Sequence, residues 1–133
     1  MPHEDGAAYA PVVATVTLGG HCVLDLYDKQ TAGDATGSKT STAGHQKPRY
    51  RILQEPRSLL VTRGDAYKSF LHGIGDLHED INLSKATITN WHLLGNAEEY
   101  SLDSKSRELR VSLTFRDVLK VSNVGSKLFG KGI

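Results

Sequence analysis

The most regular stretch of the chain, residues 11–27, has the sequence PVVATVTLGGHCVLDLY. On both sides of Gly19-Gly20 the residues alternate in the two-residue period of a β-strand, and β-branched side chains are frequent. Two glycines between two strand-like runs indicate a tight turn, so we predict a β-hairpin here. This stretch sets the expectation that strands build the fold.

Strand patterns return further along the chain, at residues 50–54, 58–62 and 107–116. A tight turn is expected around Gly64, because glycine takes a positive φ at little cost. Residues 67–74 predict a short helical turn that leads into a strand. With strands dominant and no long amphipathic helix, we predict an all-β chain.

Two tracts of about 28–48 and 75–106 are polar and weakly patterned. Such sequences contain few apolar groups to offset the entropy cost of ordering, so both are predicted to be long polar loops. The length of 133 residues suits one domain spanning 1–133.

Composition narrows the function classes only moderately. The formal net charge is +1, which does not by itself indicate a polyanionic partner. Cys22 is the only cysteine, so no internal disulfide can form and a reducing compartment is expected. No apolar run has the length of a membrane span, and we expect no membrane association.

The sequence His3-Glu4-Asp5 near the start of the chain is a candidate pair of metal ligands. In an extended segment residues i and i+2 point to the same side, so His3 and Asp5 can face one ion. His72 is the best third ligand, because it follows an aromatic and apolar stretch that would place it on the wall of the site. Two imidazoles and one carboxylate make the facial triad of mononuclear iron sites. The alternatives are a solvated terminus for His3 and Asp5 and a buried, hydrogen-bonded histidine for His72.

The strand predicted at residues 107–116 contains a second candidate site. Its two-residue period places Arg110, Ser112, Thr114 and Arg116 on one face and three apolar residues on the other. The polar face either points to solvent or lines the inside of a barrel. In the second case two guanidinium groups suit a dicarboxylate, because each can grip a carboxylate with paired hydrogen bonds.

Several motifs, in this order, resemble the AlkB family of Fe(II)/2-oxoglutarate dioxygenases. They are His3-Glu4-Asp5-Gly6 with the strands up to residue 27, Leu59–Gly64, Leu71-His72-Gly73-Ile74, and the strand Arg110–Arg116. Residues 1–6 together with Glu55-Pro56-Arg57-Ser58-Leu59 look most like the branch called AlkB homologue six. The likeness covers about half of the residues.

The resemblance implies a double-stranded β-helix, or jelly roll. Family members carry strands and a lid before the H-x-D motif, so the jelly roll is expected to be incomplete at its N-terminal side and the chain N-terminally truncated. Fe(II) would be held by His3, Asp5 and His72. Arg110 would bind the distal carboxylate of the co-substrate 2-oxoglutarate, Arg116 would lie near its metal-side carboxylate, and Ser112 stands where the family often has Asn.

The implied activity is oxidative dealkylation of an alkylated nucleobase in RNA or DNA, or of another methylated substrate, with succinate and carbon dioxide as co-products. A monomer in the cytoplasm and nucleus is expected. Two alternatives stay open: a truncated, non-catalytic jelly roll with a binding role only, and a zinc site, because the same ligands suit zinc. Lys47, Arg49 and Arg51 form a small basic cluster that either approaches phosphates or is simply solvated.

Overall fold

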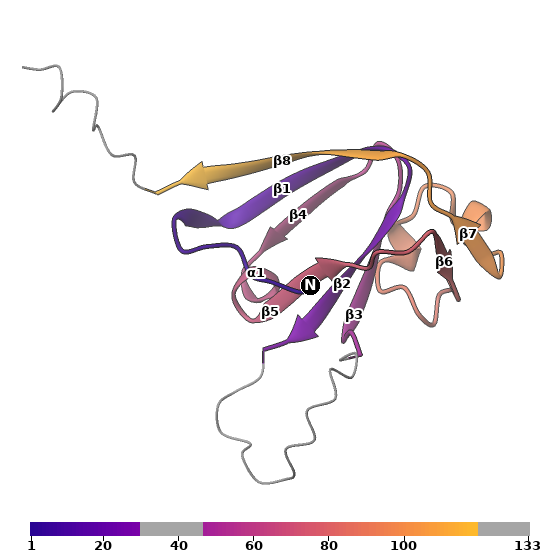
Figure 1. Ribbon diagram of the computed structural model, residues 1–133, viewed down its shortest axis with the longest axis horizontal. Coiled ribbons are helices and arrows are strands. Elements are labelled where there is room, and N and C mark those ends of the chain that lie inside the picture. Colours follow the sequence, from indigo (N-terminus) through magenta and orange to yellow (C-terminus); the bar gives the residue numbers. More distant parts are fainter. Residues whose placement is uncertain (30–46, 120–133) are drawn as a thin grey trace, which may run out of the picture.

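The computed structural model describes residues 1–29 and 47–119, which form two three-stranded sheets that face each other (Figure 1). One sheet has the strand order β4-β1-β8 and the other has the order β3-β2-β5. The strands are β1 (Tyr9–Gly19), β2 (Cys22–Asp28), β3 (Tyr50–Gln54), β4 (Leu59–Arg63), β5 (Phe70–Ile74) and β8 (Arg110–Val118). All of these pairings are antiparallel, which confirms the all-β, jelly-roll-like prediction.

The predicted hairpin at Gly19-Gly20 is wrong. β1 pairs with β4 and β8, whereas β2 pairs with β3 and β5, so the chain passes from one sheet to the other at these glycines. Gly19 has a φ of 76°, and a Cβ there would collide with the backbone carbonyl of Leu109, just before β8. Glycine is required both for a hairpin turn and for this corner, so the sequence could not separate the two.

The segment after β4 agrees with its prediction. Gly64 has a φ of 59° and precedes the single-turn helix α1 (Asp65–Lys68), after which β5 begins at Phe70. The short helix ends two residues before the strand that carries His72. It therefore returns the chain to the second sheet in the register that places His72 beside β2.

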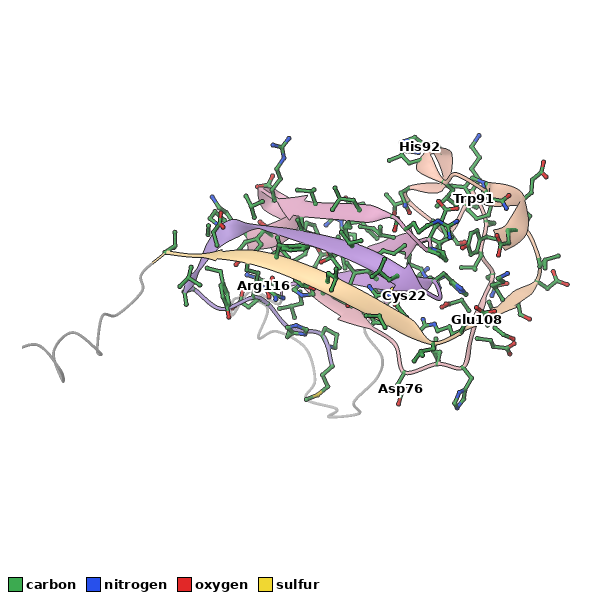
Figure 2. The ribbon with its side chains drawn as sticks, turned by 90° about the horizontal axis from the view of Figure 1, so that it is seen from above. Cys22, Asp76, Trp91, His92, Glu108 and Arg116 are labelled. Atoms are coloured by element: carbon green, nitrogen blue, oxygen red, sulfur yellow. The ribbon has the colours of Figure 1, made fainter. Side chains whose placement is uncertain are left out.

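Residues 75–106 are not the polar loop that was predicted. They contain two short strands, β6 (Glu79–Ile81) and β7 (Ser104–Ser106), which pair with each other, and two 3-10 helices, η1 (Trp91–Leu93) and η2 (Ala97–Tyr100). Figure 2 shows this segment, with Trp91 and His92, gathered at one end of the sheets. Its apolar residues are few, but Leu83, Ile88 and Tyr100 are almost completely buried against Val23 of β2 and Leu53 of β3.

A buried ion pair fixes this segment to the sheets. Asp80, 1% exposed, accepts hydrogen bonds from Nε and Nη2 of Arg107, both at 2.7 Å, and Nε2 of His21 lies 3.1 Å from the same carboxylate. Burial opposes the ionisation of Asp80. The hydrogen bonds and charges of Arg107 and His21 outweigh that effect and lower its pKa to about 2.

The outward face of the sheet β4-β1-β8 is apolar and exposed. Leu59 of β4 is 63% exposed and Phe115 of β8 is 58% exposed. Val12, Leu18, Val61, Val111 and Leu113 also belong to the exposed apolar residues of these three strands. The alternate residues of these strands, among them Arg110, Ser112, Thr114 and Arg116 of β8, therefore face inward, between the two sheets.

The predicted loop at 28–48 lies mostly outside the described residues, which omit 30–46. Within the described parts of the chain, no helix is long and apolar enough to span a bilayer.

Candidate metal centre

The first residues of the chain are held against β5. The backbone N–H of His3 donates to the carbonyl of His72 at 2.9 Å, and the N–H of His72 donates to the carbonyl of His3 at 2.8 Å. A Cβ on Gly73 would lie 3.3 Å from the Cα of Pro2, so glycine permits this close approach. The N-terminal segment is thereby fixed as a short strand partner of β5, and both histidines are brought to one place.

The three predicted ligands converge at this place. Ligand atoms of His3, Asp5 and His72 all lie within 4.8 Å of one another, and the two imidazole centroids are 4.5 Å apart. Donors at about 2.0–2.2 Å from one ion are roughly 3–4 Å apart, so small side-chain rotations would close the set around a metal. Two imidazoles and one carboxylate fit Fe(II) with open positions, and they also fit zinc.

The surroundings favour the neutral form of His72, which is the form that binds a metal. Burial lowers its pKa, and the charges of His3 and Arg116 act in the same direction, against the opposing effect of Asp5. His72 therefore stays deprotonated to a lower pH than an exposed histidine.

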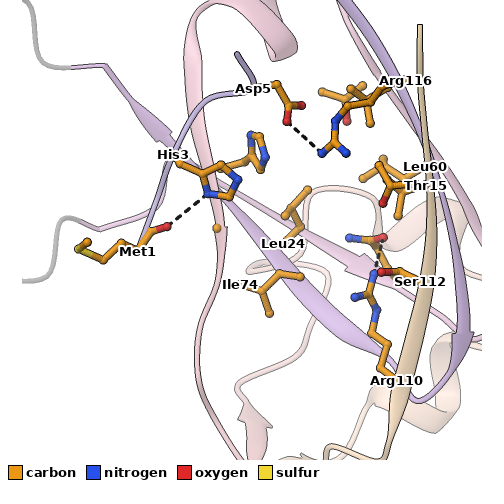
Figure 3. Close-up of a pocket in the computed structure, with 16 residues that line it drawn as sticks. Met1, His3, Asp5, Thr15, Leu24, Leu60, Ile74, Arg110, Ser112 and Arg116 are labelled. Carbon is orange, nitrogen blue, oxygen red and sulfur yellow. Dashed lines mark hydrogen bonds and ion pairs between the residues drawn. The ribbon is translucent and has the colours of Figure 1, made fainter. Parts of the chain in front are cut away.

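Arg116 lies directly beside the candidate metal ligands. Its Nη2 is 3.0 Å from Oδ1 of Asp5 (Figure 3). Its guanidinium carbon is 5.6 Å from the ring centroid of Tyr9. The ion pair holds the Asp5 carboxylate toward the two histidines. The structure thus places Arg116 near the metal end, and its predicted contact with 2-oxoglutarate stays a prediction.

Arg110 stands at the other end of the same space. Its Nη2 donates to Oγ1 of Thr17 at 3.2 Å and to Oε1 of Gln54 at 3.4 Å. The Thr17 hydroxyl also donates to Gln54 Oε1, at 3.1 Å. The Nε of Arg110 is buried and has no hydrogen-bond partner among the described residues. Arg110 is thus fixed by two neutral groups and retains a donor that is free to bind an acceptor.

A cavity of about 360 Å³ lies between the sheets and joins these two ends. Arg110, Ser112, Thr114 and Arg116 of β8 all line it, so this face of the strand points inward rather than to solvent. Figure 3 shows His3 and Asp5 on one side of the cavity and Arg110 with Ser112 away from them. The other lining residues are Met1, Val13, Thr15, Leu24, Gln54, Leu60, Thr62, His72, Gly73 and Ile74.

The sequence prediction did not include Thr17 and Gln54, the two buried partners of Arg110. Thr17 is fully buried and Gln54 is 3% exposed. Thr17 lies on the same strand face as Thr15 and Val13, and this polar face of β1 was an available signal. Gln54 is a single polar residue at the end of a strand, and nothing in its sequence context distinguished it from a solvated glutamine.

The fold and the ligand set together define a jelly-roll-like protein with a candidate mononuclear metal site. No protein-family model matches the chain. The chain is 36% identical over 121 residues, 91% of its length, to the zebrafish (Danio rerio) protein "Probable RNA/DNA demethylase ALKBH6". The match confirms the resemblance to the AlkB family and to its homologue-six branch. The chain spans about half, 48%, of the length of this relative.

Proposed function

We propose that the chain carries the catalytic site of an AlkB-type, Fe(II)- and 2-oxoglutarate-dependent dioxygenase. The substrate would be an alkylated nucleobase of RNA or DNA, or another methylated compound, and succinate and carbon dioxide would be the co-products. One observation carries the proposal: His3, Asp5 and His72 converge at one end of a cavity whose other end holds Arg110. The similarity to a probable RNA/DNA demethylase supports it.

Arg110 is the proposed binding group for the distal carboxylate of 2-oxoglutarate. Its Nε is a buried donor without a partner in the described part of the chain, and its Nη2 is fixed by Thr17 and Gln54. A carboxylate placed against this edge would accept the unused hydrogen bond and gain a charge-assisted contact. Thr17 and Gln54 act as positioning residues, since they orient the guanidinium without supplying charge.

Bound Fe(II) would supply the oxidation of an alkyl C–H bond, coupled to the conversion of 2-oxoglutarate to succinate and carbon dioxide. His3, Asp5 and His72 would hold the iron. Arg116 keeps the Asp5 carboxylate in place, and it would lie near the metal-side carboxylate of the co-substrate. The apolar walls formed by Val13, Leu24 and Leu60, among others, limit water in the cavity.

A second candidate function is a jelly-roll fragment that binds but does not catalyse. The apolar outward face of β4-β1-β8 favours this possibility. The two functions differ in one product, because only the dioxygenase forms succinate.

The test is succinate formation by the purified chain, with Fe(II), with zinc and without metal, in the presence of 2-oxoglutarate. Fe(II) binding is measured in parallel by isothermal titration under anaerobic conditions. His72→Ala should abolish both, whereas His92→Ala, an exposed histidine on the 75–106 segment, is the matched control and should change neither. Metal affinity that survives His72→Ala unchanged would show that the site assignment is wrong.

A further inference from the structure

A second hollow lies on the outer side of the sheet β3-β2-β5. It has a volume of about 670 Å³ and lies between the start of β3 and residues 82–89. Asp25 and Arg51 line it, and the two-residue period of their strands places them on the same face as the buried Val23 and Leu53. The groove is therefore separated from the metal cavity by the sheet itself. We call it the basic groove.

Four cationic side chains line the basic groove: Lys47, Arg49, Arg51 and Lys85. Asp25 is the one acidic residue among its lining residues. Since the whole chain has a net charge of only +1, this is a local concentration of positive charge.

The four cations differ in how far neighbouring carboxylates neutralise them. Arg49 Nη1 lies 3.0 Å from Asp28 Oδ1, and Arg51 Nε lies 3.4 Å from Asp25 Oδ1. Lys47 and Lys85 are exposed and form no ion pair with the described residues. Within the described parts of the chain, the groove thus offers two ammonium groups without an ion pair and two guanidinium groups whose remaining N–H donors are available to an anion.

The basic groove begins close to the metal end of the cavity. On the inner face of the sheet, Tyr50 pairs with Leu26 and Leu26 pairs with His72. Two strand spacings therefore separate Tyr50 from His72, about 10 Å. Arg51 points to the opposite face. Arg49, just before β3, lines the groove and also contacts Tyr50 and Asp28, so it lies at the free edge of β3, between the groove and the face that carries the candidate metal ligands.

An aromatic side chain stands at that edge. Tyr50 is 37% exposed, and the Arg49 guanidinium carbon lies 5.7 Å from its ring centroid. The ring also packs against Phe70 of β5, with centroids 5.6 Å apart, so it leans across the inner face of the sheet and only its exposed part can contact a base while the cations bind the backbone. This combination is suited to a nucleic-acid strand, whereas a small free anion would not use the ring.

We propose that the basic groove binds the sugar–phosphate backbone of a single-stranded nucleic acid whose target base enters the metal cavity. The proposal rests on the proposed function, because a base must leave the stack to reach a buried reaction centre. Arg49 and Arg51 would contact phosphate oxygens through their planar donors, and Lys47 and Lys85 would contribute point charges.

The test is the fluorescence anisotropy of a labelled single-stranded oligonucleotide of about 12 nucleotides, titrated with the full chain without iron or 2-oxoglutarate. Lys47→Glu and Lys85→Glu each change an exposed cation of the groove. Arg63→Glu, at the exposed end of β4 in the other sheet, makes the same kind of charge change and serves as the matched control. Thermal unfolding followed by circular dichroism shows whether each variant is folded.

Each groove variant should raise the dissociation constant about three- to tenfold. It should also reduce the slope of log Kd against log salt concentration by about 0.7 for each phosphate that is no longer neutralised. Arg63→Glu should leave both quantities unchanged. Equal weakening by all three variants would assign binding to overall charge and overturn the proposal. The proposal is also overturned if the groove variants bind normally. It is overturned, too, if millimolar inorganic phosphate displaces the labelled oligonucleotide as effectively as an unlabelled competing strand does. Because binding is measured without cofactors, a failed succinate assay would count against the proposed function and not against the groove.

Discussion

Replacing Arg110 with Ala should remove the group that distinguishes 2-oxoglutarate from shorter 2-oxo acids. In the structure this guanidinium has two neutral partners, Thr17 and Gln54, and one buried donor without a partner in the described residues. Loss of one partner from a desolvated charge pair costs about 2–5 kcal/mol. At 1.36 kcal/mol per tenfold, the affinity for 2-oxoglutarate should fall by about 30-fold to several thousand-fold.

The assay is anaerobic isothermal titration of the Fe(II)-loaded chain with 2-oxoglutarate and, separately, with pyruvate, which lacks the distal carboxylate. Arg110→Ala should weaken 2-oxoglutarate binding and leave pyruvate binding unchanged. Arg110→Lys should recover only part of the loss, because an ammonium group cannot reproduce the planar donor pair. An equal loss for both ligands would mean that Arg110 supports the fold of the cavity, and no loss for either would refute its role in co-substrate binding.

Three further outcomes follow from the fold. Asp80→Asn should lower the free energy of unfolding by about 3 kcal/mol in urea titrations, because Arg107 is left buried without its counter-charge. The pKa of Asp80 is lowered to about 2. Its ionised form therefore contributes to the free energy of unfolding above the unfolded pKa near 3.8, and this contribution is lost as the pH falls through about 2. Acid titration of the wild type and of Asp80→Asn measures the difference. Gly19→Ala should cost at least about 2 kcal/mol, because its φ is positive and the new Cβ would collide with the Leu109 carbonyl, whereas Gly6→Ala, with open space around it, should cost little in the same assay. Phe115→Lys should reduce the binding of an apolar dye to the outward sheet face while the free energy of unfolding changes by less than about 0.5 kcal/mol.

Local alternation was enough to predict individual strands, and the order of motifs singled out His3, Asp5 and His72, which the structure brings together. The strands at residues 50–54, 58–62 and 107–116 correspond to β3, β4 and β8, with ends that differ by a few residues. Strand pairing was not accessible, because a pair of glycines suits a hairpin and an inter-sheet corner equally well. The partner of β1 depends on contacts with β8, which is nearly one hundred residues away along the chain.

Burial in the 75–106 segment was hidden for a different reason. Leu83, Ile88 and Tyr100 are separated by polar residues and show neither a helical nor a strand period, yet each is at most 3% exposed. They are buried because they pack on the outer face of the sheet β3-β2-β5, and no local sequence pattern indicates such a contact. Asp80 adds a buried ion pair to the same segment, and a charged residue in a polar tract gives no sign that it lies inside the fold.

The two arginines of β8 lie in different electrostatic environments, and that difference bears on how a dicarboxylate would be oriented. Arg116 is paired with Asp5, so the two charges largely cancel beside the histidines. Arg110 contacts only neutral groups among the described residues, so its charge is uncompensated at the far end of the cavity. A dicarboxylate entering without metal would therefore be attracted first to Arg110. A divalent ion held by His3, Asp5 and His72 would restore positive charge at the other end. Only then would each of the two carboxylates of the ligand lie beside a positive charge. Metal and co-substrate should consequently bind with positive coupling, since each supplies the charge that the other needs.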